Sequence, residues 1–79
     1  MRLDKFLKIS RLIKRRTVAK EASESGKVLI NGKVAKASEN VNVGDTITIN
    51  FSNNTISVEV INDGESITNP KPEELYVRI

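Results

Sequence analysis

The residues best suited to chemistry in this sequence are its arginines and lysines. Residues 1–36 carry 11 basic and three acidic residues, a net charge of +8, whereas residues 37–79 carry two basic and seven acidic residues, a net charge of −5. Arginine offers a planar fork that donates to two phosphate oxygens, and lysine offers a mobile point charge. Such a polarised chain predicts a polyanionic partner for its basic half, and nucleic acid is the best match.

The other side chains argue against catalysis. The 79 residues include no histidine and no cysteine, so the commonest general base and the thiol nucleophile are both missing. The four glycines are scattered at turns and form no phosphate-binding loop. Magnesium held by Asp63 and Glu65 is conceivable, but a solvated Asn-Asp-Gly turn explains these residues better. We therefore predict a non-enzymatic protein that needs no metal or cofactor.

The spacing of the basic residues predicts a single binding surface. On the expected first helix, the side away from the apolar stripe carries Arg2, Lys5 and Lys8. The connection that follows carries Arg11, Lys14, Arg15 and Arg16, and Lys20 lies about a turn into the second helix. The free amides that open this second helix add partial positive charge. A following hairpin extends the footprint. The predicted nucleic-acid-binding residues are Arg2, Asp4, Lys5, Lys8, Arg11, Lys14, Arg15, Arg16, Lys20, Asn31 and Lys33.

The few aromatic residues indicate how nucleic acid would be recognised. A single-strand binder needs exposed rings on which bases stack. Only Phe6, Phe51 and Tyr76 are available, and we expect the first two to face the core. We therefore predict a structured RNA, recognised through its shape and backbone and not through base stacking.

Two short helices are expected to position the basic residues. Leu3, Phe6 and Leu7 form an apolar stripe at helical spacing within residues 2–9. The second helix is expected to begin with Thr17 as its N-cap and to run to about Ser25. Its expected buried side chains are Val18, Ala19 and Ala22, and Gly26 is its expected stop.

A small antiparallel sheet is expected to follow. A strand at 28–30, an Asn-Gly turn at 31–32 and a return at 33–34 form a hairpin. Residues 46–51 alternate, with Ile47, Ile49 and Phe51 expected to face inward, and residues 55–61 supply the pairing strand. The fold class is therefore α+β, with two helices on one face of a small twisted sheet.

The tail, residues 66–79, admits two predictions. Pro72 could open a helical turn that ends at Leu75, or Tyr76 to Ile79 could form an edge strand, and the pattern does not choose between them. We expect one domain over residues 1–79, with its core motif in residues 1–51. No apolar run approaches the length of a membrane span, so a cytoplasmic protein is expected. We also expect a monomer.

Five motifs occur in order along the chain and together suggest a family. They are Arg2-Leu3-Asp4-Lys5-Phe6-Leu7, Ser10-Arg11-Leu12, Arg16-Thr17-Val18-Ala19-Lys20, Gly26-Lys27-Val28-Leu29-Ile30-Asn31-Gly32-Lys33-Val34 and Val43-Gly44-Asp45-Thr46-Ile47. This combination resembles the RNA-binding domain first seen in ribosomal small-subunit protein four. The resemblance implies helices and an adjoining hairpin that face structured RNA. It also implies prominent basic positions at Arg2 and Arg16, with Asp4 orienting one of them.

Members of this family differ in what accompanies the domain. Many carry a catalytic domain, and the stand-alone heat-shock members usually carry a long basic extension, whereas this chain ends in an acidic segment. It is most similar to the short stand-alone members of the family that act in ribosome-associated quality control. That resemblance implies binding to 50S subunits obstructed by peptidyl-tRNA and contacts with 23S rRNA and P-site tRNA. It also implies assistance to the partner RqcH in alanine tailing of stalled chains.

Three other functions stay open at this point. A heat-shock-type recycling factor would use the same basic face on the ribosome. A general RNA chaperone would bind unrelated duplex and single-stranded RNAs with comparable affinity. A protein–protein adaptor would use the acidic half of the chain, including Glu73 and Glu74, as its working surface.

Overall fold

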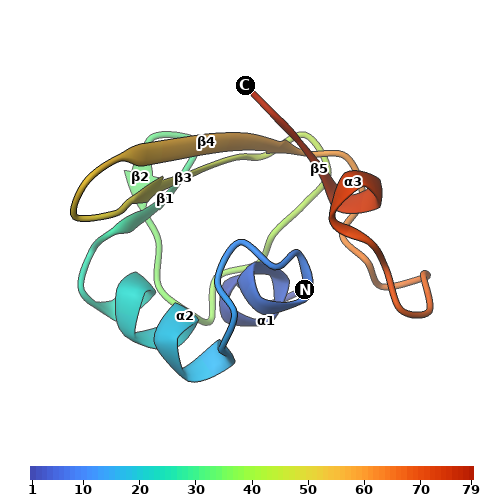
Figure 1. The fold of residues 1–79 in the computed structure, drawn as a ribbon, viewed down its shortest axis with the longest axis horizontal. Helices are drawn as coiled ribbons and strands as arrows, with labels where there is room; N and C mark the ends of the chain where they lie inside the picture. The colour runs from blue at the N-terminus through green and yellow to red at the C-terminus, as the bar shows by residue number, and fades with distance from the viewer.

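Two helices from the start of the chain pack against one face of a five-stranded sheet in the computed structural model, which describes residues 1–79 (Figure 1). The helices are α1 (Leu3–Ile9) and α2 (Arg16–Glu24). The strands are β1 (Val28–Ile30), β2 (Lys33–Val34), β3 (Thr46–Asn50), β4 (Thr55–Val60) and β5 (Tyr76–Arg78), and the one-turn helix α3 (Pro72–Leu75) precedes β5. This arrangement confirms the predicted α+β class.

The sheet is antiparallel throughout, in the order β2-β1-β3-β4-β5. The hairpin between β1 and β2 turns at Asn31 and Gly32, whose φ angles are 52° and 82°. Both angles are positive, as a type I′ turn requires. The predicted hairpin is therefore confirmed.

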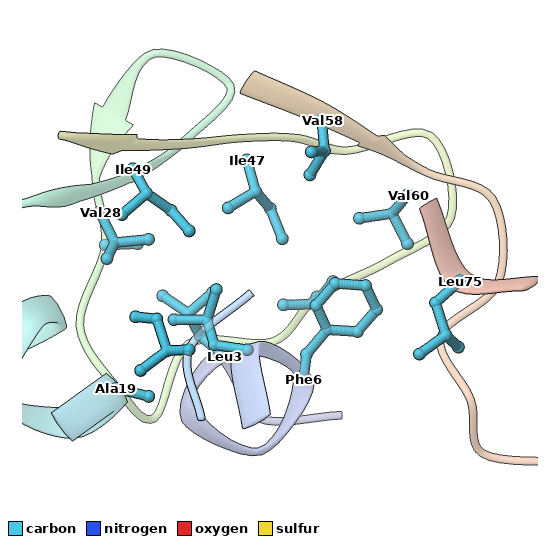
Figure 2. Packing of buried hydrophobic residues seen from close by; sticks show 13 residues of the cluster. Leu3, Phe6, Ala19, Val28, Ile47, Ile49, Val58, Val60 and Leu75 are labelled. Atoms are coloured by element: carbon cyan, nitrogen blue, oxygen red, sulfur yellow. The ribbon is translucent and has the colours of Figure 1, made fainter. Parts of the chain in front are cut away.

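The core lies between the helices and the sheet (Figure 2). α1 contributes Leu3, Phe6 and Leu7, all fully buried, as their helical spacing predicted. The sheet and α3 supply most of the opposite side of the core, namely Val28, Ile47, Ile49, Val58, Val60 and Leu75. Because all these side chains are apolar and excluded from water, their burial fixes α1 on the sheet.

The beginning of the chain is tied to a distant segment by backbone hydrogen bonds. The amide of Leu3 donates to the carbonyl oxygen of Glu39 at 2.8 Å, and the amide of Asp4 donates to that of Ala37 at 3.1 Å. The amide of Val41 donates in turn to the carbonyl oxygen of Met1 at 2.8 Å. Residues 37–41 therefore hold the entry of α1 in place.

The second helix differs from its prediction in two respects. It begins at Arg16, with Arg15 in extended conformation before it and no side-chain cap, so the predicted Thr17 cap is wrong. Val18 is 45% exposed, whereas Ala19 is fully buried. The inner face follows the spacing from Ala19 to Ser23, whose hydroxyl donates to the Ala19 carbonyl oxygen at 2.8 Å, and Val18 lies beside that face.

Phe51 also departs from its prediction, since it is 38% exposed and does not face the core. β3 ends one residue earlier, at Asn50, and the Phe51 amide donates to the carbonyl oxygen of Asn54 at 2.8 Å. The alternation of a strand stops where the chain turns, so Phe51 is not the next inward residue.

Both structures predicted as alternatives for the tail are present. Pro72 opens α3, the helix ends at Leu75, and the next residues pair with β4 through Val60 and Tyr76. Gly64, which precedes the tail, has a φ of 83° and lies close to the side chains of Ile9 and Leu75. The C-terminal half is therefore part of the same packed unit as α1.

Candidate nucleic-acid interface

One buried carboxylate lies where α1 and α2 meet. Asp4 is 3% exposed, and its Oδ1 accepts from the backbone amide of Lys5 at 2.8 Å. Arg2 Nε donates to Oδ1 at 3.2 Å, and Arg2 Nη2 donates to Oδ2 at 3.3 Å. Arg16 Nε lies 3.4 Å from the same Oδ2. Asp4 therefore holds two guanidinium groups that are 14 positions apart in the sequence.

The surroundings of Asp4 keep it ionised. Burial alone raises the pKa of Asp4, but hydrogen bonds from Arg2, from the Lys5 amide and from Arg16 lower it further than burial raises it. The pKa therefore lies below its ordinary value of 3.8. Because the carboxylate stays charged at neutral pH, the pairing with both arginines persists there.

The two arginines remain accessible to a ligand. Their side chains are 51% exposed for Arg2 and 48% exposed for Arg16. A guanidinium has five N–H donors, and Asp4 engages only some of them. The remaining donors of both side chains are therefore available to phosphate oxygens.

Three further cations line a hollow at the end of α1. Lys8, Arg11 and Lys14 surround about 480 Å³ together with Ile9, Asn69 and Pro70. Arg11 has a φ of 62°, a left-handed conformation at the end of α1. No carboxylate forms an ion pair with these three cations, since all three ion pairs in the structure involve Met1, Arg2 or Arg16. Their mutual repulsion favours an anion in the hollow.

The other predicted residues lie outside these two groups. Lys5, Arg15 and Lys20 are exposed on the helices or their connection. Asn31 and Lys33 belong to the hairpin between β1 and β2. Their contact with nucleic acid stays a prediction.

Asn31 has a structural role that explains its presence. Its Nδ2 donates to Asp45 Oδ1 at 3.0 Å, and its Oδ1 accepts from the Thr46 amide at 2.9 Å. Both polar atoms of the amide are therefore engaged in joining the hairpin to the start of β3. The Asn-Gly turn pattern alone does not predict these contacts of Asn31 with Asp45 and Thr46.

No sequence pattern predicted a role for Asn69 and Pro70. They line the cationic hollow, although they follow Arg11 by almost 60 positions. Only the tertiary fold brings these two residues beside Lys8, Ile9 and Arg11 at the end of α1. No local pattern could have linked them to the basic residues.

The acidic residues considered for magnesium form a tight turn. Asn62 Oδ1 accepts from the Gly64 amide at 2.8 Å, and Asp63 Oδ1 accepts from the Glu65 amide at 3.0 Å. Glu65 also pairs with the amino group of Met1 at 3.2 Å. No group of three or more acidic side chains is placed to hold a metal ion, and none of the helices is both long and apolar enough to cross a membrane.

Comparison with protein families identifies the first half of this arrangement. The model of the S4 domain matches residues 1–47, which include both arginines, Asp4 and the β1–β2 hairpin. The chain belongs to the S4 domain family. This confirms the family suggested by the ordered motifs.

Relatives with curated names extend the similarity across most of the chain. A protein of Halalkalibacterium halodurans named RQC P-site tRNA stabilizing factor is 50% identical over 76 residues, which are 96% of this chain and 86% of the relative. A protein of the same name from Bacillus subtilis is 57% identical over 60 residues, which are 76% of this chain and 70% of the relative. This S4 domain chain is thus similar to that group beyond the S4 match itself.

A solved structure shows the same fold. Heat Shock Protein 15 of Vibrio cholerae, described as trimeric, superposes with a TM-score of 0.83 and is 33% identical in sequence. The superposition covers 100% of this chain and 81% of that protein. The packing of α3 and β5 onto the S4 domain therefore has a counterpart in a known structure.

Proposed function

We propose that this S4 domain protein is a non-enzymatic RNA-binding factor of ribosome-associated quality control. It binds 50S subunits obstructed by peptidyl-tRNA and contacts 23S rRNA and the P-site tRNA. By holding that tRNA it assists RqcH in alanine tailing of the stalled chain. The similarity to proteins named RQC P-site tRNA stabilizing factor supports this role.

The observation that carries the proposal is the pair of arginines fixed by one buried carboxylate. Arg2 and Arg16 come from different parts of the chain, yet both donate toward Asp4 and both keep half of their side chains in solvent. Arginine side chains lose conformational entropy when they bind, and a side chain already restrained loses less. The two arginines are therefore already oriented to bind phosphates, and binding costs them less conformational entropy.

The mechanism follows from the kinds of contact that the surface can make. Guanidinium groups form paired hydrogen bonds with phosphate oxygens, and the hollow lined by Lys8, Arg11 and Lys14 can receive a further phosphate. Such contacts read the backbone and the shape of a folded RNA, not its sequence. A factor of this kind stabilises the position of a tRNA without chemistry.

Replacing Arg16 by alanine tests this function. We expect Arg16→Ala to weaken binding to 50S subunits carrying peptidyl-tRNA by about 10- to 100-fold, because charge-assisted hydrogen bonds contribute about 1.5–3 kcal/mol. Co-sedimentation across a protein titration measures the affinity. A reconstituted reaction with RqcH should show correspondingly shorter alanine tails.

A matched control separates this effect from a general loss of charge. Arg78→Ala removes an exposed arginine of β5, outside the proposed interface, and should leave 50S binding unchanged. Circular dichroism should show both variants folded, since each side chain is at least partly exposed. Binding by Arg16→Ala equal to that of Arg78→Ala would contradict the proposal.

A further inference from the structure

An apolar groove lies beside the basic surface, next to α2 and the end of β3. It encloses about 330 Å³. Its apolar side chains are Leu12, Ile13, Val18, Ala22, Ile49 and Phe51, and its polar ones are Lys14, Lys27, Asn50 and Ser52. The two residues that were expected to be buried and are not, Val18 and Phe51, therefore line the same groove.

The polar residues of the groove carry donors and no negative charge. Lys14 and Lys27 are exposed cations without an acidic partner. Asn50 Oδ1 accepts from the Thr55 hydroxyl at 3.0 Å, which leaves the Asn50 amide group free to donate. The hydroxyl of Ser52 makes no hydrogen bond within the chain and can donate or accept. A ligand that fits these groups has an apolar part, polar edges and negative charge.

We propose that the groove holds one unstacked nucleotide of a bound RNA, with its base against Phe51 and its neighbouring phosphates on Lys14 and Lys27. An exposed aromatic ring stabilises a base by stacking, whatever the identity of that base. The proposal rests on the proposed function in that the ligand is RNA. It adds a contact with a base outside a helix to a surface that otherwise contacts only the backbone.

The position of Lys14 favours a nucleotide over an apolar segment of a protein. Lys14 lines this groove and also the hollow that it shares with Lys8 and Arg11. An RNA strand on the cationic hollow can therefore continue into the groove without leaving positively charged surface. A partner helix with an apolar face would gain nothing from the two lysines unless it also carried acidic residues.

A pair of RNA hairpins tests the proposal directly. The first hairpin contains a single bulged 2-aminopurine, and the second has the same helix fully paired. The wild-type protein should bind the bulged hairpin more tightly and should quench its fluorescence as the base stacks. Phe51→Leu should weaken binding of the bulged hairpin by about 5- to 100-fold and leave the paired hairpin unaffected.

Two variants serve as controls. Phe51→Trp keeps an aromatic surface at the same position and should retain the preference for the bulged hairpin. Val34→Ala shortens an exposed apolar side chain outside the groove and should behave as the wild type. Thermal unfolding followed by circular dichroism checks that all variants remain folded.

The results distinguish this proposal from the proposed function. Paired-hairpin binding that depends on Arg16, together with equal binding of both hairpins by the wild type, would reject the nucleotide site and keep the RNA-binding function. A similar loss with both hairpins in Phe51→Leu would also overturn the proposal. So would Phe51-dependent binding of an acidic, leucine-containing peptide without any preference for the bulged hairpin.

Discussion

A single carboxylate decides how two arginines face solvent in this protein. Without Asp4, the guanidinium groups of Arg2 and Arg16 would repel each other, and their side chains would sample many rotamers. With it, both guanidinium groups are held at one carboxylate, and each arginine keeps about half of its side chain in solvent. At the scale of the residue, Asp4 thus favours phosphate binding by restraining the two arginine side chains.

Replacing Asp4 by asparagine should destabilise the protein in a pH-dependent way. Its pKa is lower in the folded chain than the ordinary value of 3.8, so its contribution is present above that value and is lost as the pH falls through the folded pKa. We expect Asp4→Asn to lower the free energy of unfolding by about 1 kcal/mol at pH 7, a modest figure because both arginines are half exposed.

Urea unfolding at pH 7 and near pH 2.5 measures this difference. The gap between Asp4→Asn and the wild type should shrink at the lower pH, because the charge of the wild-type carboxyl is lost as the pH falls through its folded pKa, which lies below 3.8. Glu24→Gln, which neutralises an exposed acid of α2 without an ion pair, is the matched control and should change little at either pH. A pH-independent gap for Asp4→Asn would show that the charge is not what stabilises the site.

At this scale the sequence predicts residue types better than their partners. Charge counts and spacing identify Arg2 and Arg16 as candidates, but only the packing of α1 against α2 brings both to Asp4. For Phe51, the sequence pattern predicts burial that the structure does not show. Its alternation with Ile49 predicts an inward ring, and the hydrogen bond that turns the chain at Asn54 is invisible in that pattern.

At the scale of the element, the tail depends on a close approach at Gly64. A Cβ at this position would lie 2.9 Å from Ile9 Cδ1 and 3.2 Å from Leu75 Cδ2, and the φ of 83° is unfavourable for any other residue. Gly64 therefore lets the turn before the tail pack closely against Ile9 of α1 and Leu75 of α3. The tail is attached to the helix that carries Lys5 and Lys8.

Gly64→Ala should therefore cost more than a change of backbone preference alone. Gly32→Ala is the matched control, because its φ of 82° is nearly the same but no atom lies within 4 Å of the added Cβ. We expect Gly32→Ala to cost about 1 kcal/mol and Gly64→Ala to cost about 1–3 kcal/mol more, through overpacking. Thermal unfolding of both variants measures the difference, and equal losses would argue against a tight fit at Gly64.

The elements that the sequence predicts well are those with local signals. The stripe of α1 and the turn at Asn31-Gly32 each depend on residues close together in the chain. The start of α2 is missed by two residues, since its N-cap is Arg15 and not Thr17, and no side chain caps it. The sequence alone could not assign the tail, because β5 forms only through pairing with β4, a contact between different parts of the sequence.

At the scale of the whole molecule, the two halves of the chain differ in charge but share one core. Leu75 of the acidic half packs in the same cluster as Phe6 of the basic half (Figure 2). Residues of the −5 half therefore complete the core on which the +8 half packs. The acidic residues lower the total charge to +3 and leave the helical surface positive.

Binding to RNA should therefore weaken steeply with salt. Each phosphate that the protein neutralises releases counterions, so the logarithm of the association constant falls linearly with the logarithm of salt concentration. Contacts by about six of the predicted cations give a slope of roughly −4 to −5. Arg16→Ala should reduce this slope by about one, and Arg78→Ala should not change it.

Fluorescence anisotropy with a labelled structured RNA at four or more salt concentrations measures these slopes. The comparison is informative because both variants lose the same charge, so net charge alone would shift both slopes alike. A slope near zero for the wild type would contradict phosphate contact as the source of affinity.

The tie between the start of the chain and residues 37–41 has a consequence for synthesis. The ribosome makes Arg2, Asp4 and Arg16 first, but the backbone that holds the entry of α1 follows more than 20 residues after Arg16. At about 5–20 residues per second, that interval is roughly one to four seconds. During it the nascent protein has every charge of the arginine pair and lacks the support that orients them. The arginine pair therefore cannot reach its final arrangement before residues 37–41 have been made, although the helices that carry it are made first.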